Sequence, residues 1–298
     1  MNKNEKDNLS AKIQINWYPG HMAKAKRLIN ENINLIDIVY EVIDARIPFS
    51  SKIIDMDDFI KNKPKILIMN KIDLCDIKET KKWKKYYEKK GYSVVLTSLE
   101  KSFNEKELTN LTEEILKPYN NKRQEKEMIK RKNRVLVVGV PNVGKSTLIN
   151  RLTGKKVVAI GNKPGITKGL NWVRINDKLE LLDSPGILWP KLEQKNALNL
   201  ATFTAIREEI LPKFEIVKYI LETLDKYYPE KLKERYKVEE LNEDIIISLE
   251  EIGKRRGCLI KGGEIDYDKT IELIINDVKN GYISGITFDR IEEYEKEL

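Results

Sequence analysis

Eight residues, 139–146, constrain the fold of this chain more than any other part of its sequence. They read G-V-P-N-V-G-K-S, which fits the pattern G-x-x-x-x-G-K-[ST]. An apolar run at 135–138 precedes them and a helical pattern at 145–152 follows, which is the strand-loop-helix context of a phosphate-binding loop. In such a loop the glycines let backbone N–H groups converge on phosphate oxygens at a helix amino end, the lysine reaches the β and γ oxygens, and the serine hydroxyl ligates Mg²⁺. The residues expected around the phosphates are Gly139, Pro141, Asn142, Val143, Gly144, Lys145, Ser146 and Thr147.

A second motif, N-K-I-D at 70–73, ends the apolar run 65–69 and predicts a guanine site. Guanine offers its N1–H and 2-amino groups as neighbouring donors, and the Asp73 carboxylate can accept from both, whereas adenine would leave it unpaired. Asn70 can contact the opposite edge of the base, and Thr97 and Ser98, which end another predicted strand, can add backbone contacts. Alone, this short match is equally well explained by a turn at a strand end, and the phosphate-binding loop in the same chain makes it informative. The expected guanine-binding residues are Asn70, Lys71, Asp73, Thr97 and Ser98.

Two further loops are expected on the γ-phosphate side. The sequence D-S-P-G at 183–186 follows a predicted strand, so that Asp183 can hold Mg²⁺ through water and the Gly186 amide can meet the γ-phosphate. Turn chemistry alone would also explain S-P-G. Thr167 lies in the loop 163–169, and its hydroxyl is the best candidate to close over Mg²⁺ when GTP is bound. The predicted Mg²⁺ ligands are Ser146, Thr167 and Asp183.

The order of the motifs differs from that of an ordinary small GTPase, in which the phosphate-binding loop comes before the base-reading motif. Joining the old chain ends through 116–133 and cutting after Gly186 reproduces the order seen here without disturbing the sheet. The cut leaves both the N-terminal segment and the C-terminal part beside the γ-phosphate, so its loss could reorient the C-terminal part. The predicted fold is α/β: a circularly permuted P-loop GTPase domain with a mostly parallel six-stranded sheet, followed by an all-α helical domain.

Apolar periodicity places the elements. Strands are predicted at 35–44, 65–69, 93–97, 134–138, 171–175 and 179–182, and helices at 21–31, 55–61, 78–89, 105–116 and 145–152. After Leu192 the strand signal disappears, and one helical face carries Phe214, Val217, Ile220, Leu221 and Leu224. We therefore expect a GTPase domain at 1–192, including an N-terminal segment at 1–34, and a domain of four or five short helices at 193–298, interrupted by a loop at 253–263. The basic stretch 120–133 is expected to be a solvated helix or a linker.

The charge of the chain favours a polyanionic partner, because its formal net charge is +8 and its pI is near 9.1. The basic residues 254–256 and Lys261, spaced by glycines, could approach a phosphate chain or could form a solvated turn. Trp83, Tyr86 and Tyr87 lie among lysines and could stack on bases. On a crossover helix such rings more often pack against the sheet, which is the interpretation we prefer.

Other features bear on the compartment. Cys75 and Cys258 are far apart and lack metal-ligand spacing, so we expect two ordinary thiols in a reducing compartment. Residues 1–16 contain no apolar segment and no arginine, which argues against a secretory signal or a mitochondrial presequence. No apolar run approaches the length of a membrane span. We expect a cytoplasmic protein without a membrane or DNA partner.

Three features of the sequence together resemble the ribosome biogenesis GTPase A (YlqF) family, and the resemblance covers nearly the whole chain. They are W-Y-P-G-H-M-A-K-A at 17–25, the permuted order of the nucleotide motifs, and K-R-R-G at 254–257 with K-G-G at 261–263. The resemblance implies a GTPase that acts late in assembly of the large (50S) ribosomal subunit. Its implied partners are the subunit precursor and its rRNA, with docking in the GTP form and release on hydrolysis. It also implies a helical domain similar to RNA-binding ANTAR modules, GTP or GDP with Mg²⁺ as cofactors, and K⁺ bound at Asn142.

The residue that activates the attacking water is not evident from the motifs alone. Many small GTPases use a glutamine just after D-x-x-G, but Ile187 occupies that place and has no suitable group. His21, the only histidine, is either the catalytic residue or a helix histidine without a catalytic task. The family resemblance favours the catalytic role, because relatives with a hydrophobic residue after D-x-x-G are thought to use this histidine. Two other functions stay open: a nucleotide-gated RNA-binding scaffold with negligible turnover, and a signalling GTPase with a protein partner.

Overall fold

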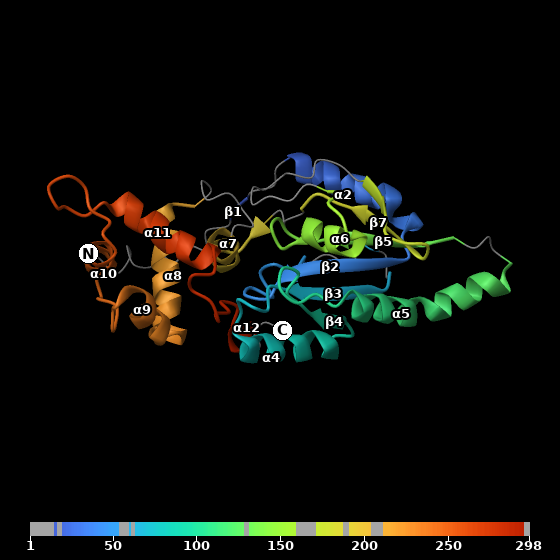
Figure 1. Ribbon diagram of the computed structural model, residues 1–298, viewed down its shortest axis with the longest axis horizontal. Coiled ribbons are helices and arrows are strands. Elements are labelled where there is room, and N and C mark those ends of the chain that lie inside the picture. Colours follow the sequence, from blue (N-terminus) through green and yellow to red (C-terminus); the bar gives the residue numbers. More distant parts are fainter. Residues whose placement is uncertain are drawn as a thin grey trace, which may run out of the picture.

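The structure is a computed structural model that describes residues 15–16, 20–53, 60, 63–127, 131–158, 171–186, 191–203 and 211–294. It consists of a twisted sheet with helices on both faces and a group of helices beyond one edge of the sheet (Figure 1). The strands of the sheet are β2 (Ile38–Asp44), β3 (Lys65–Asn70), β4 (Ser93–Leu96), β5 (Asn133–Val138), β6 (Asn171–Arg174) and β7 (Leu179–Asp183). All six predicted strands are confirmed, each to within three residues at its ends.

The sheet order is β4-β3-β2-β5-β7-β6, and every neighbouring pair is parallel except β6 with β7. The strand that leads into the phosphate-binding loop, β5, therefore lies between β2 and β7, in the middle of the sheet. Because the strands are parallel, the loops after β2, β3, β4, β5 and β7 all emerge at one edge. This confirms the permuted α/β fold and explains how motifs from distant parts of the chain can meet.

Helices cover both faces of the sheet because its central strands are apolar on both sides. One face packs against α5 (Glu105–Glu125) and α6 (Lys145–Thr153), and the other against α2 (Gly20–Asn32) and α4 (Ile77–Lys89). On α4, Trp83 and Tyr87 are buried against the sheet while most of the lysines face solvent. The packing interpretation of these aromatic rings is therefore confirmed.

Helix α5 corrects a prediction. We expected it to end at Leu116, but it continues through Pro118 to Glu125. A proline inside a helix removes one backbone hydrogen bond, and here the helix ends in residues 122–125, K-R-Q-E, all of which favour helix. Its carboxyl end is also held by Arg123, which pairs with Asp37 just before β2. The first part of the basic stretch 120–133 is thus helix. The helix predicted at 55–61 lies almost wholly outside the described residues.

A helical group follows the sheet, and we use this name for α7 (Gln194–Thr202), α8 (Lys213–Tyr227), α9 (Pro229–Tyr236), α10 (Ile245–Arg255) and α11 (Tyr267–Lys279). The predicted apolar face of α8 is confirmed, since Val217, Ile220, Leu221 and Leu224 are fully buried. We expected a loop to begin at Gly253, but this residue lies within α10. A Cβ atom there would lie 2.7 Å from Thr270 Oγ1 of α11, so close packing of the two helices requires glycine. The domain boundary at residue 192 stays a prediction.

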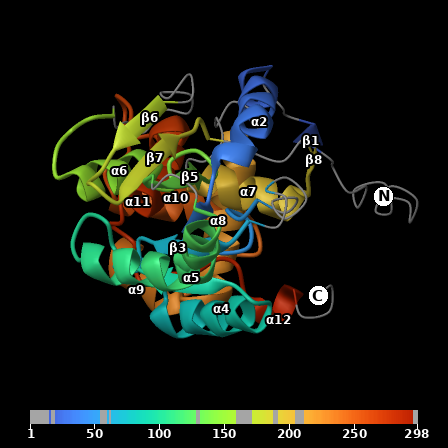
Figure 2. The ribbon, with the colours of Figure 1, turned by 90° about the vertical axis from the view of Figure 1, so that its right-hand side faces the viewer.

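The helical group is joined to the sheet at the carboxyl edge of the strands. The Asp289 carboxylate accepts hydrogen bonds from the backbone N–H groups of Phe49 (2.8 Å) and Ser50 (2.7 Å), in the loop after β2. Its backbone carbonyl accepts from Trp83 Nε1 at 2.8 Å. A short helix, α12 (Ile291–Tyr294), then packs against α4. The C-terminal part of the chain therefore touches the same edge from which the predicted nucleotide loops emerge (Figure 1), and α12 lies beside α4 (Figure 2).

Three smaller findings complete the fold. Strand β1 (Ile15–Asn16) pairs antiparallel with β8 (Lys191–Leu192), a contact that the sequence did not predict. Cys75 and Cys258 are both buried free thiols, as expected. Among the helices that the structure describes, none has the length and apolar character needed to cross a membrane.

Candidate nucleotide site

The predicted phosphate-binding loop connects β5 to α6, and its glycines are required by close contacts. Gly139 has φ +151°, and a Cβ atom there would lie 2.3 Å from the Val42 carbonyl oxygen. Gly144 has φ +111°, and a Cβ atom there would lie 2.4 Å from Asn70 Nδ2. Larger residues would therefore clash as well as strain the backbone. Ser146 and Thr147 are half-buried in the first turn of α6, where backbone N–H groups are free to meet an anion.

Asn70 ties the base-reading motif to the phosphate-binding loop. Its Nδ2 donates to the Val143 carbonyl at 2.7 Å, and its Oδ1 accepts from the Leu99 N–H at 3.0 Å. The residue is 4% exposed and joins segments 73 positions apart. We expected Asn70 to contact the base, and the structure gives its amide a bracing task between two loops that sequence reasoning missed.

Lys71 extends this connection to a buried ion cluster. Its backbone is in the left-handed region at φ 67°, and its Nζ donates to the Asn142 carbonyl (2.9 Å) and to Asp44 Oδ2 (2.8 Å). Asp44 also receives Arg46 Nε at 3.0 Å and Nη2 at 2.8 Å. Burial raises the pKa of the Asp44 carboxyl, but the charges of Arg46 and Lys71 outweigh this and hold it well below its usual range. The cluster is therefore ionised at neutral pH.

Asp44 and Arg46 were not among the residues predicted from the sequence. A usable signal existed, because Asp44 is an acid that ends a fully buried strand at the ligand-binding edge. Arg46 also connects the ion cluster to the helical group. Its Nη1 donates to the Val278 carbonyl of α11 at 3.3 Å, and its guanidinium lies 4.3 Å from the centre of the Phe203 ring.

The other guanine candidates surround a recessed carboxylate. The side chain of Asp73 is 18% exposed, and Lys101 Nζ lies 3.1 Å from its Oδ2. Burial raises the Asp73 pKa, but hydrogen bonds from Ser98 and Lys101 bring it below its ordinary value. The Thr97 carbonyl accepts from the Ile72 N–H at 3.3 Å, which places the strand end 97–98 beside the base-reading motif. The ionised Asp73 carboxylate can accept from the neighbouring N1–H and 2-amino donors of guanine, and backbone groups of two loops lie beside it.

Lys145 and Asp183 lie where the γ-phosphate side of the site is predicted. Lys145 Nζ donates to the carbonyls of Gly139 (3.1 Å) and Val140 (2.9 Å), and burial lowers its pKa to about 8. Asp183 is 1% exposed, and neither of its carboxylate oxygens is hydrogen-bonded to any residue that the structure describes. Burial raises its pKa to about 6, with Lys145 offsetting only part of the cost. A buried carboxylate whose oxygens have no hydrogen-bond partner among the described residues is suited to binding a divalent cation.

Gly186 brings the loop after β7 against the phosphate-binding loop. A Cβ atom on Gly186 would lie 2.8 Å from the backbone nitrogen of Pro141. Thr167 and Ile187 lie outside the described residues. His21 is in the first turn of α2, but its side chain is not among those described. The pairing of β1 with β8 places residues 15–16, which precede His21 in the chain, beside residues 191–192, which follow Gly186.

The loops thus bring together a glycine-rich turn at a helix amino end, a buried lysine and carboxylate, and a recessed acceptor for a base. Such a site can hold a nucleoside triphosphate with its metal ion. Comparison with known proteins agrees. Residues 134–254 match the family described as 50S ribosome-binding GTPase.

Relatives match over almost the full length. Ribosome biogenesis GTPase A of Priestia megaterium is 44% identical over 96% of this chain and 100% of its own length. The protein of that name from Thermotoga maritima is 33% identical over 94% of this chain and 95% of its own. The crystal structure of GNP-bound YlqF from T. maritima aligns with a TM-score of 0.62 at 30% identity, covering 90% of this chain and 99% of that one. This chain is a GTP hydrolase that belongs to the ribosome biogenesis GTPase A family.

Proposed function

We propose that the GTP form of this protein binds rRNA of a nearly complete large ribosomal subunit and that hydrolysis releases it. A continuous series of contacts between the nucleotide loops and the helical group carries this proposal. The Asn142 carbonyl in the phosphate-binding loop accepts from Lys71, which shares Asp44 with Arg46, and Arg46 donates to Val278 in α11. A shift of the phosphate-binding loop between the GTP and GDP forms therefore acts on the position of the helical group.

Each nucleotide residue has a proposed role. Asp73 accepts from the guanine N1–H and 2-amino groups, with Thr97 and Ser98 lining the base. Lys71 and Asn70 hold the base-reading motif against the phosphate-binding loop. The phosphates are bound by Gly139, Pro141, Asn142, Val143, Gly144, Lys145, Ser146, Thr147, Thr167 and Gly186. Since Lys145 is buried among carbonyl oxygens, a phosphate would offer it a full negative charge that these carbonyls lack.

Mg²⁺ fits beside Asp183. The ion would be held by the Ser146 hydroxyl, by Thr167 and by Asp183 through water, and it would neutralise charge on the β and γ phosphates. The buried Asp183 carboxylate supports this, because a divalent cation would offset the free-energy cost of removing its charge from water.

His21 is our proposed catalytic residue, orienting the attacking water. Support comes from the β1–β8 pairing, which joins residues 15–16, upstream of His21, to residues 191–192, downstream of Gly186. We also propose that K⁺ binds at Asn142, which predicts faster turnover in K⁺ than in Na⁺. Equal rates in the two salts would end it.

Turnover of GTP with and without purified large subunits tests the function. We expect stimulation by subunits in the wild type, and about a 100-fold or greater loss of stimulated turnover in His21→Ala with GTP affinity unchanged. Asn30→Ala, an exposed polar position on the same helix, is the control and should behave as wild type. Negligible turnover both with and without subunits would favour the scaffold. Subunit binding that is insensitive to salt would favour a protein partner, because phosphate contacts weaken steeply with salt.

A further inference from the structure

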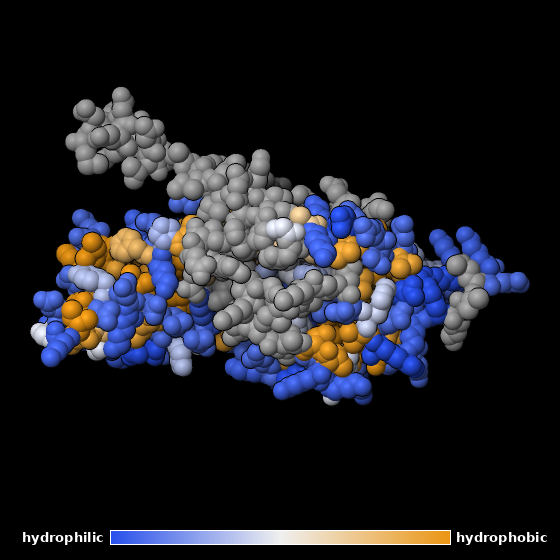
Figure 3. All heavy atoms as spheres, turned by 90° about the horizontal axis from the view of Figure 1, so that it is seen from above, coloured by the Kyte–Doolittle hydropathy of each residue, from blue (hydrophilic) through white to orange (hydrophobic). Residues whose placement is uncertain are grey.

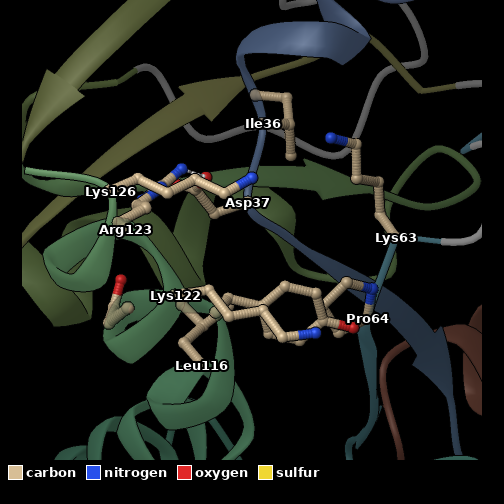
Figure 4. A pocket seen from close by; sticks show the side chains of 10 residues that line it. Ile36, Asp37, Lys63, Pro64, Leu116, Lys122, Arg123 and Lys126 are labelled. Carbon is tan, nitrogen blue, oxygen red and sulfur yellow. Dashed lines mark hydrogen bonds and ion pairs between the residues drawn. The ribbon is translucent and has the colours of Figure 1, made fainter. Parts of the chain in front are cut away.

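A cavity of about 280 Å³ lies at the edge of the sheet opposite the nucleotide loops (Figure 4). Its walls are the second half of α5 and the residues just before β2 and β3, including Asp37, Lys63 and Pro64. The strands are parallel, so the residues that precede them and the loops that follow them are at opposite edges. We call this cavity the basic pocket. A ligand in it would leave the nucleotide site accessible.

Positive charge is in excess around the basic pocket. Lys63 stands on one wall, and Lys122 and Lys126 on the other. Within the part of the chain that the structure describes, none of these three ammonium groups pairs with an acid. The carboxylate in the lining, Asp37, is already committed: it accepts from Arg123, from Arg131 Nη1 (2.8 Å) and from the Arg134 N–H (2.8 Å). An anion entering the pocket thus meets three ammonium groups and a neutralised acid.

The pocket also has an apolar and aromatic side. Ile36 and Leu116 are buried residues of its lining, and Tyr119 lines it with 51% of its surface exposed. An exposed ring among lysines is the combination with which proteins bind single-stranded nucleic acid, since the bases stack and the phosphates pair with ammonium groups. The volume is at the lower limit of small-molecule sites, which suits one nucleotide of a longer chain.

We propose that the basic pocket binds a single-stranded segment of RNA, with one base against Tyr119 and the flanking phosphates on Lys63, Lys122 and Lys126. The inference rests on the proposed rRNA function and extends it to a second contact. The pocket and the helical group lie at opposite ends of the molecule (Figure 1), and hydrophilic side chains predominate around the end that carries α5 (Figure 3). RNA contacts at both ends would fix the orientation of the protein on the subunit, while the nucleotide site between them stays free to act.

The test compares two charge-reversal pairs on exposed helix surfaces. The pocket pair is Lys122→Glu on α5 with Lys126→Glu at the carboxyl cap of that helix, and the control pair is Lys81→Glu with Lys85→Glu on α4. Both pairs have the same spacing and change the net charge equally. Binding to purified large subunits and to a single-stranded RNA oligonucleotide is measured as a function of salt, and GDP binding is measured in parallel.

Two lost phosphate contacts should lower the association constant by about 25-fold at about 0.1 M salt, and should reduce the slope of log K against log salt by about 1.4. The control pair should change binding less than about twofold, and GDP affinity should be unchanged in both. Tyr119→Ala should weaken binding by about 5- to 100-fold without altering the salt slope.

The possible failures are distinguishable. If the wild type does not bind subunits, the proposed function is wrong and this inference with it. If the wild type binds and the pocket pair binds equally well, or if both pairs weaken binding to the same extent, only the basic pocket is refuted. Photocrosslinking from position 119 to a ribosomal protein rather than to rRNA would refute RNA as the ligand.

Discussion

Replacing Asp183 by asparagine should stabilise the nucleotide-free protein while removing its response to Mg²⁺. Burial raises the carboxyl pKa from 3.8 to about 6, a difference of about two pKa units, which corresponds to about 3 kcal/mol. Above pH 6 the folded protein bears this cost in full, because the carboxylate is charged in both the folded and the unfolded state. Between pH 6 and 3.8 the folded state binds a proton that the unfolded state does not, so the cost disappears as the pH falls.

Asparagine has nearly the same shape and no charge. Its buried amide would itself cost about 1 to 2 kcal/mol if left unpaired, so the net gain at pH 7.5 is about 1 to 2 kcal/mol. For a chain of this size that is a rise in melting temperature of about 2 to 4 °C. Thermal unfolding of both proteins without nucleotide, at pH 7.5 and at pH 5, measures it. The difference between variant and wild type should shrink at the lower pH.

Addition of GDP with Mg²⁺ should reverse the order, because the wild type gains the metal contact and the variant does not. Glu180→Gln on the same strand is the control: it removes the ion pair with Arg134 and should lower stability slightly, by at most about 1 kcal/mol. If Asp183→Asn melts at or below the wild-type temperature without nucleotide, or gains as much as the wild type from Mg²⁺, the assignment of this carboxylate to the metal is wrong.

Three further substitutions test the rest of the site. Asp73→Asn should weaken GTP binding by about 100-fold or more, since one guanine donor is left facing an amide N–H. Equilibrium binding of a fluorescent GTP analogue measures this, and an unchanged affinity would show that Asp73 does not contact the base. Gly144→Ala places a Cβ atom 2.4 Å from Asn70 Nδ2 and should abolish nucleotide binding. Gly154→Ala, with φ +66° and no atom within 4 Å of the added Cβ, should cost only about 1 to 2 kcal/mol of unfolding free energy in urea and leave nucleotide binding intact. Equal nucleotide affinities in the two variants would contradict the packing argument. Among the described residues, Arg46→Met leaves Lys71 as the one ion-pair partner of the buried Asp44, and it should destabilise the protein by about 3 to 5 kcal/mol. Adding Asp44→Asn should restore a large part of this loss, and no recovery in the double variant would show that the ion pair is not the cause.

Local patterns in the sequence were sufficient for the sheet and for most of the nucleotide loops. The strands are runs of buried residues, and burial on both faces leaves an unbroken apolar signal that does not depend on the partner strand. The phosphate-binding loop and the base-reading motif are short enough for their chemistry to be complete within eight and four residues. Their order along the chain then required the permuted topology, which the sheet order confirms.

Other features were decided only by the tertiary structure. The bracing role of Asn70 depends on residues 73 positions away, and the contact of Arg46 with α11 spans 232 positions. The basic pocket forms because α5 continues beyond Pro118 and faces the starts of two strands. Hydrophobic periodicity reports which face of an element is buried but not which distant side chain it will meet, so the sequence determined the elements and the phosphate chemistry, while packing determined how the nucleotide site is connected to the rest of the molecule.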